Sequence, residues 1–361
     1  MLKSIVGFLQ TDKKFTLLFI VVAGIYAAFF MWGNRPAEKR TPSAAVQKFE
    51  RVQKQWENNI KNTKALEEYL KKKPALNFMV QLFSLLTVVA IGIGIVLNFM
   101  LLLKPALRSR FSRDGPPDFT EWRLGMLFKV VVLILGANIV LAVILGLVRR
   151  FFGVHFSMNV YALFHTTVID ALCLIFILSV IRPFGGSRQS IGLDFSGLNL
   201  FREIGIGIGG YLAILPVFLT LIVGLILFAK FIHYEPPPHP LVELFLEEEK
   251  RAPWVIVYSL FLASIAGPVF EEIFFRGFCY NLFKNKWGSR WAMILSAAFF
   301  SVIHQSEFAF LPIFLLGLAL AYLYEKRGSL VASITLHVVH NSIFIGYFFL
   351  AKHLVLAGSG G

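Results

Sequence analysis

Apolar runs long enough to cross a membrane recur along the whole chain. They lie near residues 16–32, 78–103, 124–149, 157–181, 204–230, 253–270, 290–306, 309–325 and 329–351. A helix needs about 20 apolar residues to cross the hydrocarbon core of a bilayer, with about 17 as the lower end. Because 57% of the 361 residues are hydrophobic and only 16% are charged, a water-soluble fold is excluded. The sequence therefore predicts an all-α, polytopic transmembrane helical bundle with about eight or nine transmembrane helices.

The positive charge of the chain is distributed between the apolar runs. The formal net charge is +14, and charge of this kind is explained by anionic headgroups and by the positive-inside rule. We therefore expect the lipid bilayer as a partner and no nucleic acid. Nine spans with a cytoplasmic N-terminus would place the basic segments 104–123, 182–203 and 271–289 in the cytoplasm, as connectors between helices.

Composition divides the chain into three parts. Residues 1–77 would form an N-terminal anchor helix and a polar amphipathic loop, residues 78–203 transmembrane helices with basic connectors, and residues 204–361 the membrane core that carries most of the chemistry. The apolar centre of the first run has about 17 residues, which is longer than that of a signal peptide. We therefore expect this helix to be retained as an anchor.

The polar segment 33–77 carries apolar residues near helical spacing, namely Val46, Phe49, Trp56 and Ile60. One interpretation is an amphipathic helix that lies on the headgroups or packs on a partner. A solvated helical linker is the other interpretation, and the sequence favours neither.

Ionisable and polar residues inside apolar helices are costly and usually functional. In the C-terminal third they fall on three separate helices, as Glu271, Glu272, Arg276, His304, His337 and Asn341. Glu272 and Arg276 are four residues apart, so they share a helix face and can pair. The side chain of Glu271 points about 100° away from that face. His337 and Asn341 are also four apart and can reach one point.

These side chains suit the hydrolysis of a peptide bond. A carboxylate and an imidazole, such as Glu271 and His304, can take a proton from water. A second imidazole and an amide, such as His337 and Asn341, can donate to the oxyanion that forms on an attacked carbonyl. Taken singly, His304 could be a polar contact between helices, and Glu272 with Arg276 could be an interfacial salt bridge. Three helices that each bring polar groups favour a site.

Three motifs in this order resemble those of the CAAX protease and bacteriocin-processing (CPBP) family of intramembrane proteases, which includes the type II CAAX prenyl endopeptidases. They are Glu271-Glu272-x-x-x-Arg276, Phe300-x-x-x-His304 and His337-x-x-x-Asn341. The resemblance implies an all-α membrane core around a cavity open to the cytosol. It implies that Glu271 and His304 activate water, that His337 and Asn341 stabilise the oxyanion, and that Glu272 and Arg276 organise the site. His340 stands where many relatives have an asparagine.

The predicted function is that of a membrane-embedded, glutamate-type endopeptidase that cuts a peptide or protein substrate, with or without an attached lipid, near the membrane surface. We expect no cofactor, and a multi-pass location in the plasma (inner) membrane of a bacterium with the active site facing the cytoplasm.

Three alternatives remain open. A zinc-dependent membrane protease could use Glu271, His304 and His337 as ligands, although the chain has no His-Glu-x-x-His sequence. A non-catalytic scaffold or an immunity-type member of the same family would need none of this chemistry. A proton-coupled transporter would be expected to show internal repeats, and the first half of the chain has no second copy of the motifs.

Overall fold

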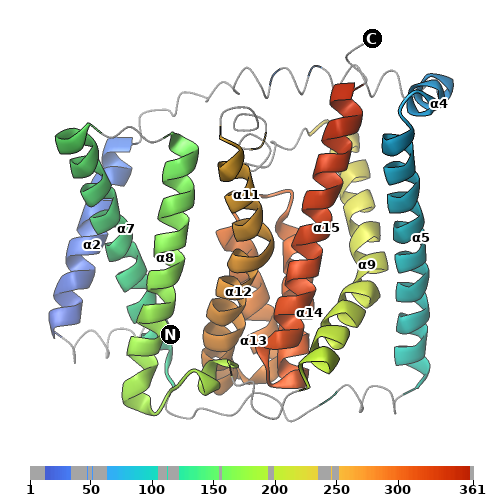
Figure 1. Ribbon diagram of the computed structural model, residues 1–361. Helices are drawn as coiled ribbons and strands as arrows, with labels where there is room; N and C mark the ends of the chain where they lie inside the picture. Colours follow the sequence, from blue (N-terminus) through green and yellow to red (C-terminus); the bar gives the residue numbers. More distant parts are fainter. Residues whose placement is uncertain are drawn as a thin grey trace. The chain divides into compact units, whose positions relative to one another are not determined.

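The computed structural model of the chain is all-helical over the residues that it describes (Figure 1). These are residues 13–33, 63–104, 122–153, 157–193, 199–234 and 252–357, with the single residues Gln47, Arg51, Ser112 and Phe245. The helices before residue 240 are α2 (Lys13–Gly33), α4 (Thr63–Lys71), α5 (Pro74–Leu103), α7 (Leu124–Phe152), α8 (Met158–Ile181) and α9 (Leu200–Phe231). Two short 3-10 turns, η1 (Arg182–Phe184) and η2 (Gln189–Ile191), follow α8.

The C-terminal part is helical almost throughout. It consists of α11 (Pro253–Phe261), η3 (Leu262–Ala266), α12 (Gly267–Glu272), η4 (Ile273–Tyr280), α13 (Asn281–Ile303), α14 (Phe310–Arg327) and α15 (Leu330–Ala357). The segments η3 and η4 are π-helices. No strand occurs among the described residues, and the predicted all-α fold is confirmed.

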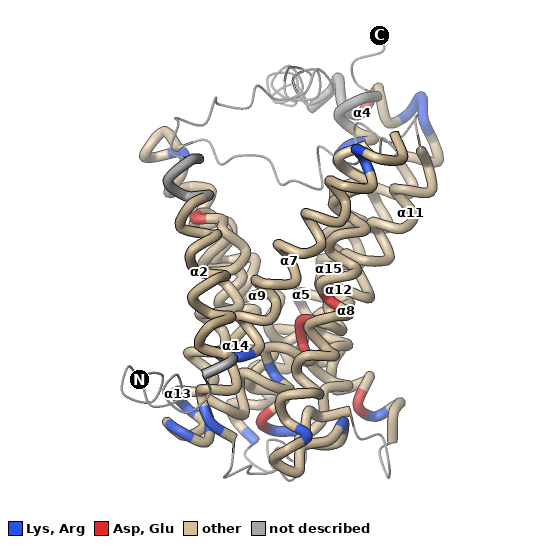
Figure 2. The backbone as a smooth tube through the Cα atoms, turned by 90° about the vertical axis from the view of Figure 1, so that its left-hand side faces the viewer, with Lys and Arg blue, Asp and Glu red and all other residues tan. Residues whose placement is uncertain are grey.

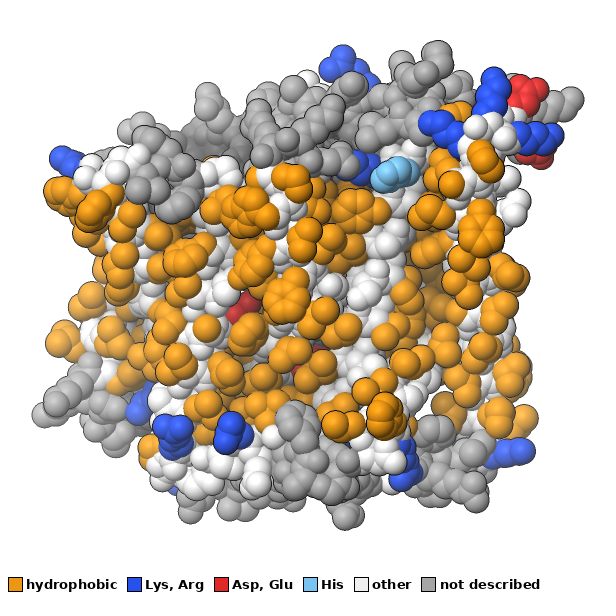
Figure 3. All heavy atoms as spheres, viewed as in Figure 1, with side chains coloured by type: hydrophobic (Ala, Val, Ile, Leu, Met, Phe, Trp, Pro, Cys, Tyr) orange, Lys and Arg blue, Asp and Glu red, His pale blue; other side chains and the backbone are white. Residues whose placement is uncertain are grey.

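Six helical stretches are long and apolar enough to cross a membrane. They are Pro74–Leu103, Leu124–Phe152, Met158–Phe184, Leu200–Phe231, Pro253–Ile303 and Leu330–Leu354, and Phe15–Ala28 is a shorter apolar stretch. Many large apolar side chains of these helices are exposed, and they cover much of the face seen in Figure 3. In water such a surface would be unfavourable, whereas lipid accommodates it. The protein is therefore a polytopic integral membrane protein.

The predicted connector 271–289 lies within a long helical stretch. The chain is helical from Pro253 to Ile303, and Gly288 in α13 has non-helical dihedral angles (φ 78°, ψ 168°). The apolar residues Phe278 and Leu282 are wholly buried there. Glu272 and Arg276 form an ion pair inside the fold, as their spacing predicts, and the cytoplasmic location of this segment stays a prediction.

The amphipathic interpretation of segment 33–77 falls on Val46, Phe49, Trp56 and Ile60, which lie outside the described residues. The described part of this segment is Gln47, Arg51, α4 and the start of α5. The divisions near residues 77 and 203 stay predictions.

The chain forms two compact units, each built from segments that are distant in the sequence. Unit 1 comprises Met1–Arg40, Phe111–Gly205 and Ile265–Ile334, and unit 2 comprises Thr41–Arg110, Ile206–Ser264 and Thr335–Gly361. Glu271, Glu272, Arg276 and His304 belong to unit 1, whereas His337 and Asn341 belong to unit 2.

In unit 1, the core lies where α7, α8, η4, α13 and α14 pack together. A buried ion pair adds to it: Nε of Arg327, at the end of α14, donates to Glu203 in the first turn of α9 over 3.0 Å. The backbone also approaches closely at Gly277, where an added Cβ would lie 2.5 Å from the carbonyl oxygen of Ile191. The segment after α8 is thereby held against η4.

This close approach predicts an asymmetry between two glycine substitutions. Gly277→Ala should lower the free energy of unfolding by about 1–3 kcal/mol, because the methyl group must displace backbone atoms. Gly205→Ala, in α9 with no atom within 4 Å of its added Cβ, should be neutral or stabilising by up to about 1 kcal/mol, since alanine favours a helix. Thermal unfolding of both variants in the same detergent measures the difference, and equal melting temperatures would contradict it.

In unit 2, α5 and α9 pack at Gly94, whose added Cβ would collide with the carbonyl oxygen of Leu212. Nδ2 of Asn98 donates to the carbonyl oxygen of Ala213 over 2.7 Å. Pro216 lies within α9, and this helix bends visibly in Figure 1. A proline interrupts the hydrogen bonding of the preceding turn, and the Asn98 amide satisfies one carbonyl beside the bend.

Candidate active site

The two acidic residues Glu271 and Glu272 lie at the end of the short helix α12, between two π-helical segments. The π-helix η3 precedes α12 and η4 follows it. π-Helical turns are rare and occur frequently at functional sites, because the extra residue in the turn changes which side chains share a face. The backbone on both sides of Glu271 therefore has the irregularity that is typical of a site.

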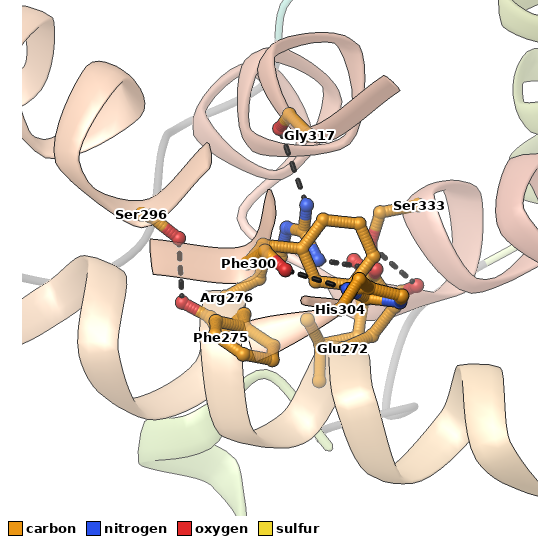
Figure 4. Close-up of polar contacts among 9 residues, drawn as sticks. Glu272, Phe275, Arg276, Ser296, Phe300, His304, Gly317 and Ser333 are labelled. Atoms are coloured by element: carbon orange, nitrogen blue, oxygen red, sulfur yellow. Dashed lines mark hydrogen bonds and ion pairs between the residues drawn. The ribbon is translucent and has the colours of Figure 1, made fainter. Parts of the chain in front are cut away.

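Glu272 and Arg276 form the ion pair that their spacing predicts. Nη1 of Arg276 donates to Oε1 of Glu272 over 2.8 Å, and both side chains are wholly buried. Nη2 donates to the carbonyl oxygen of Gly317 on α14 over 3.2 Å (Figure 4). A buried charge is tolerated when it is paired and hydrogen-bonded. The pair therefore ties η4 to α12 and to α14.

The guanidinium group of Arg276 also connects to the histidine motif through an aromatic ring. It lies 4.6 Å from the ring centroid of Phe300, which is a cation–π distance. The Phe300 ring in turn lies 4.7 Å from the imidazole ring of His304, and Figure 4 shows the three side chains grouped together. Two of the predicted motifs therefore meet within unit 1.

His304 ends α13 and has a defined orientation. Its Nδ1 atom lies 2.7 Å from the carbonyl oxygen of Phe300. A carbonyl oxygen only accepts hydrogen bonds, so Nδ1 must carry the proton and, in the neutral ring, Nε2 is the acceptor. The imidazole is exposed at the end of its helix. This arrangement suits a group that accepts a hydrogen bond from water.

Glu271 is half-buried. It interacts electrostatically with Arg276 and with Asp170 in α8. Asp170 lies near the middle of α8 and Glu271 at the end of α12, and Figure 2 shows acidic positions beside the labels of both helices. Sequence analysis missed Asp170, although the signal was present, because Asp170 is the one acidic residue in the apolar run 157–181 and intramembrane carboxyl groups are usually functional.

In unit 2, Asn341 is held by a hydrogen bond to a π-helical carbonyl. Its Nδ2 atom donates to the carbonyl oxygen of Ala263, in η3, over 2.8 Å. A π-helical turn places the backbone donor for that carbonyl at residue 268, which is a proline without an N–H. The Asn341 amide supplies the missing donor, and the same nitrogen carries a second N–H.

The two histidines of α15 have different surroundings. His337 is buried one helical turn before Asn341, so the two side chains share a face as predicted. The imidazole of His340 packs among aromatic rings, with centroid distances of 4.9 Å to Phe218, 5.8 Å to Tyr211 and 4.7 Å to Phe344. These ring contacts indicate that His340 has a packing role.

The described residues contain no group of three His, Cys, Asp or Glu side chains arranged to hold a metal ion. The proposed ligands of the zinc alternative are divided between the units, with Glu271 and His304 in unit 1 and His337 in unit 2. The choice between metal-free and zinc-dependent chemistry therefore rests on experiment.

Comparison with known proteins agrees with the motifs. Residues 253–343 match the family described as type II CAAX prenyl endopeptidase Rce1-like. Residues in this chain are also similar to the UPF0177 protein YaiF of Lactococcus lactis subsp. lactis (strain IL1403), with 37% identity over 84 residues, or 22% of this chain and 36% of that protein. The chain thus matches little more than a third of the length of this curated relative. No solved structure matches the chain.

The matched segment includes all six residues of the predicted motifs, from Glu271 to Asn341. The resemblance to CPBP intramembrane proteases is therefore confirmed for this part of the chain.

Proposed function

We propose that this protein is an intramembrane endopeptidase that cleaves a peptide or protein substrate near the membrane surface with a water activated by Glu271 and His304. One observation carries the proposal: the segment that matches a CAAX prenyl endopeptidase family contains a carboxylate, an oriented imidazole, and a His–Asn pair on one helix face. The family match supports membrane protease activity, and the division of roles among these residues is our own proposal.

The reaction begins with water. The Glu271 carboxylate takes a proton from the water while Nε2 of His304 accepts a hydrogen bond from it, and the resulting oxygen nucleophile attacks the carbonyl carbon of the peptide bond. Negative charge develops on the carbonyl oxygen. The tetrahedral intermediate then collapses, the C–N bond breaks, and the proton held by Glu271 passes to the leaving amine.

The oxyanion is stabilised by donors from α15. His337 and the second N–H of Asn341 would donate to the carbonyl oxygen as it becomes negative. Donors fixed before the reaction stabilise a transition state more than mobile ones, because they need no reorganisation. The hydrogen bond from Asn341 to Ala263 supports this role, since it fixes the plane of the amide.

The buried pair of Glu272 and Arg276 organises the site without touching the substrate. Its contacts reach α14 through Gly317 and the histidine motif through Phe300. We infer that the pair keeps α12 and the end of α13 in register, so that Glu271 and His304 can share one water.

The substrate would be membrane-associated, and a lipid on its C-terminus would fit the CAAX endopeptidase branch. We place the protein in the plasma membrane of a bacterium, with the site facing the cytoplasm. The bacterial relative supports this location, and the basic segment 182–203 supports the orientation through the positive-inside rule.

Cleavage of a peptide library tests the proposal. Detergent-purified protein should cut members of a fluorogenic library, part of which carries a farnesyl-cysteine mimic, and a chelator should leave the rate unchanged. Loss of cleavage with chelator and its return with added Zn²⁺ would establish the zinc alternative instead. If no member is cut, including the lipidated ones and peptides in proteoliposomes, a non-catalytic scaffold becomes the better account.

A further inference from the structure

Asp170 lies on the face of α8 that packs into the core of unit 1. Ile177 and Ile181 on this helix are buried in the core. Cys173 and Leu174 pack against the same core. Residues three or four positions apart share a helix face, so positions 170, 174, 177 and 181 form one stripe. Asp170 therefore continues an otherwise apolar stripe that faces the neighbouring helices.

The helices that this stripe meets include the one that carries Glu271. α8 packs against both α12 and η4, and Asp170 interacts electrostatically with Glu271. Two carboxylates in apolar surroundings repel each other strongly when both are ionised. A protonated carboxyl group, by contrast, donates a hydrogen bond to a neighbouring carboxylate.

The cations on the helices that pack against α8 have surroundings of their own. Arg276 of η4 acts electrostatically on Glu271 but its guanidinium donates to Glu272. α7, the other long helix against α8, carries Lys129 over the ring of Phe15, and Arg149 and Arg150 exposed in its last turn. The cation–π contact of Lys129 and the ion pair of Arg276 thus involve groups other than Asp170.

We propose that Asp170 is a positioning residue for Glu271: its carboxyl group donates a hydrogen bond to the Glu271 carboxylate and holds it toward the water. This inference rests on the proposed function. It explains why an acidic residue occupies a stripe where leucine or isoleucine would pack more favourably.

Two substitutions of similar size separate hydrogen bonding from packing. Asp170→Asn keeps a donor for Glu271, because an amide N–H replaces the carboxyl O–H. Asp170→Leu keeps the branched shape and fits the apolar stripe, but cannot donate. We expect kcat to fall about a hundredfold in Asp170→Leu, since a misplaced base costs about this factor, with KM unchanged. Asp170→Asn should keep most of the wild-type kcat.

Asn138→Leu in α7 is the matched control. This substitution also replaces a half-buried polar side chain of unit 1, which bonds to its own helix at the carbonyl oxygen of Ile134, and it should leave kcat unchanged. Wild-type kcat in Asp170→Leu would overturn the inference. So would an equal loss in Asp170→Asn and Asp170→Leu when both variants keep the wild-type melting temperature.

A second measurement does not need catalysis. In a double-mutant cycle, the effects of Asp170→Leu and Glu271→Leu on the free energy of unfolding in detergent should be non-additive, because the two side chains interact. Additive effects would overturn the inference even in an active enzyme. If the wild-type protein cleaves no peptide but the cycle shows coupling, the contact stands and the proposed function fails.

Discussion

Replacing Glu271 by glutamine should lower kcat for peptide hydrolysis by about 10²–10⁴-fold, the range for loss of a general base. Glutamine has nearly the same shape and still accepts hydrogen bonds, but it cannot take a proton from water. Substrate binding does not depend on this proton transfer, so KM should change little. The loss should therefore appear in kcat and in kcat/KM to the same degree.

The measurement uses the best-cleaved member of the peptide library under saturating and subsaturating conditions. Glu67→Gln serves as the control, because Glu67 is exposed on α4 and undergoes the same chemical change. Its kcat should equal that of the wild type. A Glu271→Gln variant that retains more than about a tenth of the wild-type kcat would remove Glu271 from the role of general base.

Arg276→Met should lower the free energy of unfolding by about 3–5 kcal/mol, because it leaves the wholly buried Glu272 carboxylate without its partner. The loss includes the hydrogen bond to Gly317 and the contact with Phe300. Methionine has a comparable length and no charge, so packing is retained as far as possible. Unfolding in detergent, followed by the helical signal, measures the change.

Two further variants separate charge from packing. The double variant Glu272→Met/Arg276→Met should recover most of the stability, since replacing a whole buried ion pair by apolar groups is often neutral or stabilising. Lys286→Met removes an exposed cation of α13 and should change stability by less than about 0.5 kcal/mol. A double variant no more stable than Arg276→Met would show that the cost comes from lost packing and contacts.

Much of the site could be read from spacing along single helices. Glu272 with Arg276, and His337 with Asn341, are four residues apart, and helical geometry alone places each pair on one face. The long apolar runs determined the fold class in the same way, since hydropathy over about 20 residues reports a membrane helix. The family resemblance followed from motifs that are continuous in sequence.

Features that depend on packing between several helices could not be predicted from spacing along the sequence. The continuity of the helical stretch from Pro253 to Ile303 was not evident, because the burial of Glu272 and Arg276 depends on what surrounds the pair. The π-helical segments beside Glu271 leave no clear pattern in the sequence, although Pro268 is compatible with one of them. Asp170 was overlooked because the run 157–181 is otherwise typical of a membrane span. Arg327 pairs with Glu203, which lies 124 positions earlier in the sequence, so spacing along one helix could not predict this pair.

The sequence by itself determined that the chain is an all-α membrane protein with a CAAX-protease-like segment, because hydropathy and helical spacing are properties of neighbouring residues. Only the tertiary structure decided that Arg276 reaches Gly317 and Phe300, that Asn341 donates to Ala263, and that Asp170 interacts with Glu271. Each of these interactions joins residues from different helices. Their energies depend on which helices pack side by side, and the local pattern of residues does not specify that packing.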